Sequence, residues 1–377
     1  MHVFVAGPGV GEAIAVALPE RGWLAFDGCR TGARFPLEAI LKRWRRGVDD
    51  PLYAYLLTHP HSDHAAGVPQ LIDTYSPQYI GVAATDPPSV SLLFEAAELG
   101  KRVRATVEAL DADDVRAAVL AIERWHEEHP DGLLRLHDGV SIPLPGGDVS
   151  ALVRAPAPKG LATFLAKRRL GPWLRRHANH ISVVVEIGYG DARVVLGGDL
   201  PRYPAGGKQR PVPTGWNQVL KSHPHLGTHN LLKVPHHGSR KAQHPGLMTA
   251  SADERAWCVT PYNRSRLPRL ARGDGLALLL DAQPSICLTA VPASKSVQAP
   301  VPHPGHIHLS QLRTRIEVQR TGDPFLDRGI DIRPAACGPL DAVWCFAVDR
   351  GGALCGAWRG DVGLEVMRDP VDAEGPS

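Results

Sequence analysis

Residues 52–64 read LYAYLLTHPHSDH, an apolar run that leads directly into a short segment rich in histidine. The apolar part predicts a buried strand. His59 and His61 are two positions apart, so at a strand end their side chains project to the same side. Asp63 and His64 then turn back over the same spot, which brings four metal-capable side chains together.

The residue types in this segment favour divalent metal ions. Neutral imidazoles and a carboxylate are suitable ligands for Zn²⁺, Mn²⁺ or Fe²⁺, and one further bridging carboxylate would allow two ions to bind side by side. The alternative is a histidine-rich surface loop. That alternative is weaker, because it does not explain why the histidines and the aspartate follow an apolar strand.

Two later segments have the same form, an apolar stretch that ends on metal-capable residues. Residues 194–198 lead into Asp199, and residues 231–235 lead into His236 and His237. Strand ends converge at one edge of a sheet sandwich, so ligands far apart in the sequence can meet there. We therefore expect these residues to join the first segment in one site.

The rest of the chain predicts a mixed α/β fold. Asp27 closes a strand at 22–27 and is placed to hold a ligand histidine in position. Gly7 to Glu12 resembles a dinucleotide-binding turn, but the apolar run after it is too short and too β-like for the helix that such a turn requires. Further strands are predicted at 2–6, 13–18, 181–187, 192–197, 231–234, 256–260, 286–291, 307–319 and 342–358, with helices at 36–46 and 65–75 and a helix-rich insertion at about 89–135.

Composition favours a turn-rich globular protein with neither a secretory signal nor a membrane span. The chain has 377 residues, 38 Gly, 34 Pro and a net charge of +3, which favours many turns and excludes a general polycation. The six cysteines form no CxxC pair, so we expect reduced thiols in a cytoplasmic protein. No basic leader and no apolar run of about 20 residues occurs, so neither a secretory signal nor a membrane span is expected.

The charge distribution indicates an anionic substrate. No acidic residue occurs between Asp148 and Glu186 or between Asp199 and Asp253, although both stretches contain many basic residues and adjoin predicted ligands. Aromatic residues also occur among the arginines of 161–176, a pattern suited to phosphate contact with base stacking. The alternative for that segment is an amphipathic helix with solvated arginines, but this does not explain the absence of acids from two separate stretches.

These motifs together resemble the metallo-β-lactamase superfamily, and within it the branch that includes the hydrolase domain of the DNA-uptake protein ComEC. The resemblance covers about residues 1–300 and rests on five segments: GPGVGEAIAVALPERGWLAFDG at 7–28, HPHSDHAAG at 59–67, NHISVV at 179–184, LGGD at 196–199 and LKVPHHGS at 232–239. It implies an αββα sandwich with a hydrolase domain at 1–300, followed by a small β-rich C-terminal extension at 301–377.

The resemblance also implies roles for individual residues. His59 and His61 would bind the first of two ions, most simply Zn²⁺. The second would be bound by Asp63, His64 and either His236 or His237, with Asp199 bridging. His237 is the favoured ligand, with His236 as a substrate-facing acid. A metal-bridged water or hydroxide would be the nucleophile, with Asp63 and His236 as the catalytic residues.

Some assignments stay open. His180 is the best placed third histidine for the first ion, but ComEC-like members often have no histidine there, and Asn179 fits their pattern. The surrounding residues Asp27, Asn179 and Ser182 would support the ligands from outside the metal shell. The residues expected to contact phosphate are Lys233, Arg240, Arg168, Arg169, Arg175 and Arg176.

The leading functional hypothesis is a phosphodiesterase or nuclease that acts on DNA or RNA. One alternative is a hydrolase of a small ester, lactone or thioester, with a narrow apolar pocket. The other is a non-catalytic, metal-bound subunit of a larger assembly, with 301–377 as a docking surface for a protein partner.

Overall fold

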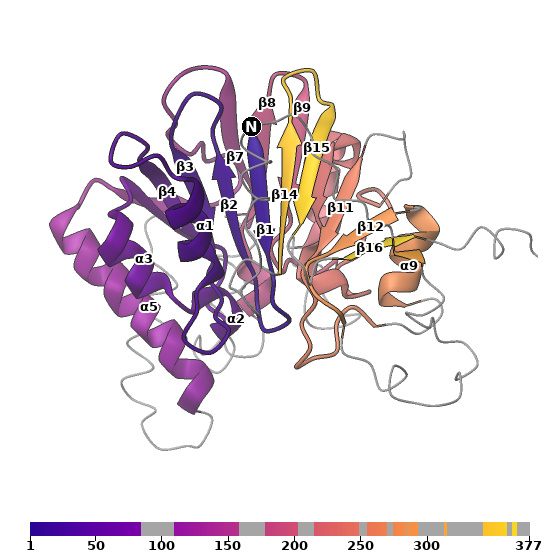
Figure 1. The fold of residues 1–377 in the computed structure, drawn as a ribbon, viewed down its shortest axis with the longest axis horizontal. Coiled ribbons are helices and arrows are strands. Elements are labelled where there is room, and N and C mark those ends of the chain that lie inside the picture. Colours follow the sequence, from indigo (N-terminus) through magenta and orange to yellow (C-terminus); the bar gives the residue numbers. More distant parts are fainter. Residues whose placement is uncertain are drawn as a thin grey trace, which may run out of the picture.

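The computed structural model describes residues 1–83, 109–157, 178–202, 215–248, 255–269, 274–283, 285–292, 313–314, 342–359 and 364–367. Two eight-stranded sheets lie face to face, and helices cover their outer faces (Figure 1). This arrangement is an αββα sandwich, as the sequence predicts. Among the described residues, no helix is both long and apolar enough to cross a lipid bilayer.

The first sheet has the strand order β15-β14-β1-β2-β3-β4-β5-β6. Its strands are β1 (His2–Ala6), β2 (Ala13–Ala17), β3 (Trp23–Phe26), β4 (Leu52–Leu57), β5 (Tyr79–Ala83), β6 (Leu133–Leu136), β14 (Val343–Val348) and β15 (Leu354–Arg359). Strands β3 to β6 run parallel to one another. The carboxyl ends of β3 and β4, which lead into Asp27 and His59, therefore lie at the same edge of the sheet.

The second sheet has the order β13-β16-β12-β11-β10-β9-β8-β7. Its strands are β7 (Val149–Ala155), β8 (Val184–Tyr189), β9 (Ala192–Leu196), β10 (Leu231–Lys233), β11 (Ala256–Val259), β12 (Ser285–Leu288), β13 (Arg313–Thr314) and β16 (Leu364–Met367). Strands β9 to β12 are parallel, so β9 and β10 deliver Asp199 and His237 to one edge. The backbone amide of Val183 donates to the carbonyl of Thr58 at 3.0 Å and joins the two sheets at this edge.

Helices form the two outer layers. The helices and 3₁₀ turns are α1 (Pro36–Trp44), α2 (Ser62–Ala65), α3 (Val68–Tyr75), α5 (Ala109–Glu128), α8 (Trp216–Ser222), α9 (Gly275–Ala282), η1 (Ala178–Ile181), η3 (Pro224–Thr228) and η4 (Pro235–Gly238). Leu37, Ile40, Leu41 and Trp44 of α1 recur on one face, as predicted, and pack against the first sheet. Of the predicted insertion at 89–135, the described part contains α5 and β6.

Three layers of apolar side chains hold the sandwich together. One lies between the first sheet and α1, α3 and α5, one lies between the sheets, and one lies between the second sheet and α8 and α9. Alternate residues of a strand belong to different layers: Val185 packs between the sheets, whereas its neighbour Val184 packs towards α8. The two faces of each sheet are therefore both buried.

The described strands of 301–377 are built into the sandwich. Strand β14 pairs antiparallel with β1, and β16 pairs antiparallel with β12. The turn at 349–352 connects β14 to β15 as a hairpin, as the sequence predicts. The C-terminal segment thus extends both sheets rather than forming only an appendage.

Candidate metal centre

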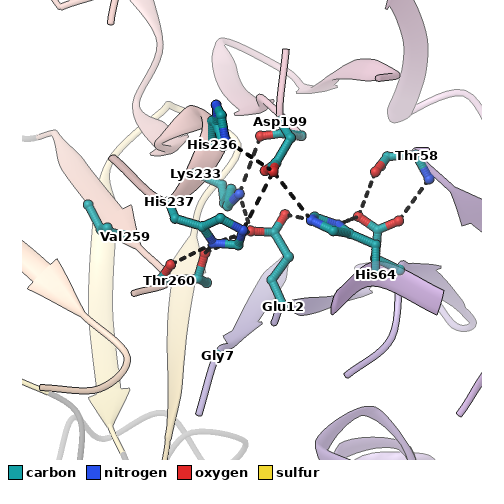
Figure 2. A network of polar contacts seen from close by, with 12 residues as sticks. Gly7, Glu12, Thr58, His64, Asp199, Lys233, His236, His237, Val259 and Thr260 are labelled. Atoms are coloured by element: carbon teal, nitrogen blue, oxygen red, sulfur yellow. Dashed lines mark hydrogen bonds and ion pairs between the residues drawn. The ribbon is translucent and has the colours of Figure 1, made fainter. Parts of the chain in front are cut away.

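The predicted ligands come together where the two sheets meet. His59 follows β4, and α2 carries Asp63 and His64. Asp199 follows the turn after β9, and His237 lies in η4 directly after β10. Figure 2 shows Asp199, His237 and His64 arranged around a common centre.

Asp27 fixes the orientation of His64. Its Oδ2 lies 2.8 Å from His64 Nδ1, and its Oδ1 accepts a 2.8 Å hydrogen bond from the backbone amide of Thr58. Because an ionised carboxylate only accepts hydrogen bonds, Nδ1 of His64 carries the proton. The lone pair of the neutral ring is therefore on Nε2, which faces Asp199 at 3.6 Å.

The same carboxylate also orients His59, through Thr58. The Thr58 hydroxyl donates to Asp27 Oδ2 at 2.7 Å, so its oxygen accepts from His59 Nδ1 at 3.0 Å. His59 Nε2 then carries its lone pair towards His61 Nδ1, at 3.1 Å, and towards Asp199 Oδ2, at 3.9 Å. One aspartate thus sets the ring orientation of two predicted ligands.

His237 is oriented by a backbone carbonyl. Its Nδ1 donates to the carbonyl of Thr260 at 2.8 Å, which leaves Nε2 as the lone-pair atom. That Nε2 lies 3.5 Å from Asp199 Oδ2 and 3.3 Å from Asp63 Oδ2. The ring also stacks on Tyr262, with the ring centroids 5.1 Å apart.

Asp199 is at the centre of the group. Its backbone amide donates to the hydroxyl of Ser182 at 2.9 Å. Gly198 precedes it with φ +49°, and a Cβ there would overlap the Ser182 hydroxyl, so the tight turn that presents Asp199 requires glycine. Asp199 Oδ2 lies within ion-pair range of a ring nitrogen in each of four histidines: His59, His64, His236 and His237.

The unpaired atoms of the cluster fit a metal centre. Glu12, His64, Asp199 and His237 are all buried, and each offers a donor atom within 4.8 Å of the others. In the described part of the chain, His64 Nε2, His237 Nε2 and Asp199 Oδ1 have no hydrogen-bond partner, although all three are buried. Buried polar atoms without partners are costly, and divalent ions would satisfy these lone pairs. The donor set of imidazole and carboxylate suits Zn²⁺.

The electrostatics of the cluster favour a cation. Burial lowers the pKa of His64, but the negative charges of Asp27, Asp199 and Asp63 outweigh burial and raise that pKa well above its usual value. Burial raises the pKa of Asp199, but the histidines around it outweigh burial, and its pKa is well below the usual value. Asp199 therefore stays ionised and attracts positive charge, either protons or a metal ion.

Three half-buried residues line the side of the cluster nearest solvent: His61, Asn179 and His236. Asn179 Nδ2 donates to Asp199 at 3.4 Å and lies 3.1 Å from His236 Nε2. His180 is half-buried on the same turn, η1, and is not among the donor atoms of the cluster. Of the two adjacent residues Asn179 and His180, it is Asn179 that contacts Asp199, the predicted bridging ligand.

His236 and His237 have different environments, although they are adjacent. Both have left-handed backbone angles, with φ of 49° and 52°. The side chain of His237 is 1% exposed, whereas that of His236 is 23% exposed. Burial lowers the pKa of His236, so this ring is neutral and accessible to a bound molecule. His237 is thus the buried ring of the pair, and His236 is the ring open to solvent.

Lys233 requires a correction. We expected it to contact phosphate, but its side chain is completely buried, its ammonium pairs with Glu12, and it donates to the carbonyl of Gly198 at 3.4 Å. It therefore points into the protein. Arg240 is exposed two residues after η4, whereas Arg168, Arg169, Arg175 and Arg176 lie outside the described residues.

Glu12 is a residue of the cluster that the sequence analysis did not assign to it. It lies in the glycine turn between β1 and β2, and its backbone amide donates to the carbonyl of Asp63 at 3.0 Å. Gly11 makes this approach possible, because a Cβ there would overlap that same carbonyl oxygen. The signal in the sequence was a single carboxylate within a run of glycine and apolar residues.

Comparison with known proteins agrees with this geometry. A family model described as "Metallo-beta-lactamase superfamily" matches residues 28–242, and the chain belongs to this superfamily, whose members are generally metal-dependent hydrolases. No curated protein matches the chain.

Several solved structures are similar to the chain. Zn(2+)-bound PqqB from Methylobacterium extorquens is 14% identical, with a TM-score of 0.31, and the match covers 62% of this chain and 69% of that one. The Rm3 metallo-beta-lactamase is 14% identical, with a TM-score of 0.35 and coverage of 62% and 75%. ST1585 from Sulfolobus tokodaii, an archaeal metallo-beta-lactamase superfamily protein, is 14% identical, with a TM-score of 0.31 and coverage of 62% and 79%.

Proposed function

We propose that this protein hydrolyses phosphodiesters, with DNA or RNA as the substrate class, at a centre that holds two divalent ions. The observation that carries the substrate class is the absence of acidic residues from 149–185, which contains His180, and from 200–252, which contains His237. A nearly neutral protein with such surroundings attracts anions to its active site.

The ligand assignments follow from the orientation of the rings. We assign His59 and His61 to one ion, and Asp63, His64 and His237 to the other, with Asp199 between them. Ions at these positions, Zn²⁺ in the first place, would supply Lewis-acid chemistry and an activated water. Asp27 and Thr260 hold the histidines in the tautomer that binds a metal.

His236, on the open side, would act on the substrate. It is neutral and partly exposed, so it can accept the proton that the attacking water loses and then pass that proton to the leaving group. The amide of Asn179 lies between His236 and Asp199 and holds both in place. Asp63 contributes its carboxylate beside His237, at 3.3 Å.

Exposed cations next to η4 are the described candidates for phosphate binding. Arg240 and Lys241 are both exposed, and the carbonyl of Lys241 accepts a 2.7 Å hydrogen bond from the amide of Arg202, close behind Asp199. The arginines at 168, 169, 175 and 176 lie outside the described residues and stay predicted phosphate contacts. Such contacts supply sequence-independent affinity for nucleic acid.

We also propose that the chain belongs to the ComEC-like branch of the superfamily. The support is the combination of the glycine turn that carries Glu12, the Asn179 to Val184 stretch and the segment LKVPHHGS at 232–239. DNA uptake itself does not follow from this resemblance.

The test is a substrate panel with metal-loaded protein: single- and double-stranded DNA, RNA, bis-(p-nitrophenyl) phosphate and simple esters. The wild-type protein should cleave the phosphodiesters, and the His59→Ala variant should not. Cleavage of esters alone would favour the small-substrate hydrolase, and metal binding without any cleavage would favour a non-catalytic subunit; either result contradicts the proposal.

Charge-reversal variants test the substrate surface. Arg240→Glu should weaken nucleic-acid binding and reduce its dependence on salt. Lys42→Glu is the matched control, because Lys42 is an exposed cation on α1, in the outer helical layer of the first sheet. Equal binding by both variants would remove Arg240 from the substrate surface.

A further inference from the structure

A completely buried ion pair lies behind the metal centre and connects the two sheets. Glu12 precedes β2 of the first sheet, and Lys233 ends β10 of the second. The side chains of both residues are 0–1% exposed, and the Lys233 ammonium contacts Glu12 Oε2 directly. Figure 2 shows Glu12 between His237 and His64, with Lys233 beside it.

Each member of the pair contacts the supports of the predicted ligands. Glu12 Oε2 accepts a 2.7 Å hydrogen bond from the Thr260 hydroxyl, and the Thr260 carbonyl accepts from His237. Lys233 donates to the carbonyl of Gly198, the residue before Asp199. The pair therefore contacts both segments of the second sheet that support a predicted ligand: Thr260, which holds His237, and Gly198, which precedes Asp199.

The carboxylate of Glu12 faces the Nδ1 atoms of two predicted ligands. It is 3.7 Å from Nδ1 of His237 and 3.9 Å from Nδ1 of His64, whereas Asp199 lies on the Nε2 side of both. The two Nδ1 atoms already donate to Thr260 and Asp27. Glu12 thus contacts two predicted ligands that come from different sheets, and Lys233 offsets its charge.

Burying an ion pair costs free energy, and an apolar pair would fill the same space without that cost. Both charges lose their hydration, and an apolar pair of similar volume would often stabilise the fold as well or better. The pair is, however, a strict constraint on geometry, because separating the sheets would leave two buried charges unpaired. Such a constraint is useful where ligands from two sheets must be held at a fixed spacing.

We propose that Glu12 and Lys233 form a positioning pair that holds the metal ligands of the two sheets at a fixed spacing. This inference rests on the metal centre proposed above and deepens it.

The experiment compares Glu12→Gln, Lys233→Met and the double variant with the wild-type chain. Zn²⁺ affinity is measured by competition with a chromophoric chelator, the Co²⁺-loaded protein is examined by visible absorption, and thermal unfolding is followed without metal. Glu186→Gln is the matched control, because Glu186 is also a buried carboxylate but pairs with Arg154 and Arg193.

We expect each single variant to bind Zn²⁺ about 10- to 100-fold more weakly and to show an altered Co²⁺ spectrum. The double variant should unfold at a higher temperature than Lys233→Met, because no lone buried charge remains, but its Zn²⁺ affinity should stay low. The control should retain the wild-type affinity and spectrum. If Lys233→Met does not fold, the double variant and Glu12→Gln decide the question.

Unchanged Zn²⁺ affinity and Co²⁺ spectra in Glu12→Gln and in the double variant would overturn the inference, whatever happens to stability. A wild-type chain that binds no metal would overturn the metal centre itself, together with this inference. The two failures are therefore distinguishable.

Discussion

At the scale of single residues, Asp27 is the carboxylate that orients two predicted ligands, His64 directly and His59 through Thr58. Its carboxylate accepts from the Thr58 amide, the Thr58 hydroxyl and His64. Burial raises its pKa, and the charge of His64 only partly offsets that effect. The ionised form is nevertheless the one that fits three donors, because a protonated carboxyl would lose an acceptor position.

Replacing Asp27 should weaken metal binding. In Asp27→Asn the side chain can no longer accept on both sides, so His64 and His59 lose their fixed tautomers, and we expect an affinity loss of about 10- to 100-fold. Chelator competition measures it. Asp50→Asn is the control, since Asp50 is a buried carboxylate that accepts from Trp23 and from the Gly22 and Arg46 amides. Equal affinity losses in both variants would show that Asp27 has no special role.

His229 predicts a pH dependence of stability that is separate from the metal site. Burial lowers its pKa to about 4, and it accepts from Trp257 Nε1 at 3.0 Å. The unfolded chain takes up a proton near pH 6.5, whereas the folded chain does not until about pH 4. The contribution of His229 to the free energy of unfolding is therefore fully present above pH 6.5. It is lost as the pH drops towards 4, by up to about 3 kcal/mol.

Metal-free wild-type protein and His229→Asn should be compared by thermal unfolding between these pH values. The variant cannot titrate at this position, so its stability should fall less steeply over this window. Parallel curves for the two proteins would contradict the assignment.

At this scale the sequence predicted most of the cluster and named Asp27, Asn179 and Ser182 as supports, but it did not predict Glu12. His59, His61, Asp63 and His64 lie in one short motif, so local spacing was enough to place them together. Glu12 could not be found in this way, because its partners come from distant segments and the other sheet. Lys233 was misassigned for the same reason, since a lysine beside a predicted ligand looks exposed until its buried partner is known.

At the scale of elements, the β14–β15 hairpin is the part of the chain whose position the sequence did not predict. The alternation of residues indicated strands at 342–358, but not their partners. Val343 to Val348 are all buried, and β14 lies between β15 and β1 in the first sheet. Pairing between the first and last parts of a chain depends on tertiary packing, which local patterns do not encode.

Removing this hairpin should destabilise the whole first sheet. A chain that ends before Ala342 would expose β1 as an edge strand and uncover the apolar side chains that β14 covers, so we expect loss of cooperative unfolding and poor solubility. A chain that ends after Met367 is the control, because it keeps every described strand. Thermal unfolding and soluble yield measure both. Cooperative unfolding of the shorter chain at the wild-type temperature would show that the hairpin is dispensable.

At the scale of the whole molecule, the αββα sandwich explains why the ligands are dispersed in the sequence. Parallel strands in each sheet end at the same edge, and the two edges meet, so short segments after β3, β4, β9 and β10 reach one point. The resemblance to the metallo-β-lactamase superfamily implied this architecture. The apolar runs that end on metal-capable residues predicted that the ligands would meet at one edge. The strand order and the contact between sheets required the structure.

The central claim is that this junction between the sheets binds two divalent ions. The most direct test is elemental analysis of the wild-type chain after loading with Zn²⁺ and removal of unbound metal, beside Asp199→Ala and His237→Ala. The account predicts two ions per wild-type chain, with fewer in both variants. Less than one ion per wild-type chain, or full retention by both variants, would contradict it.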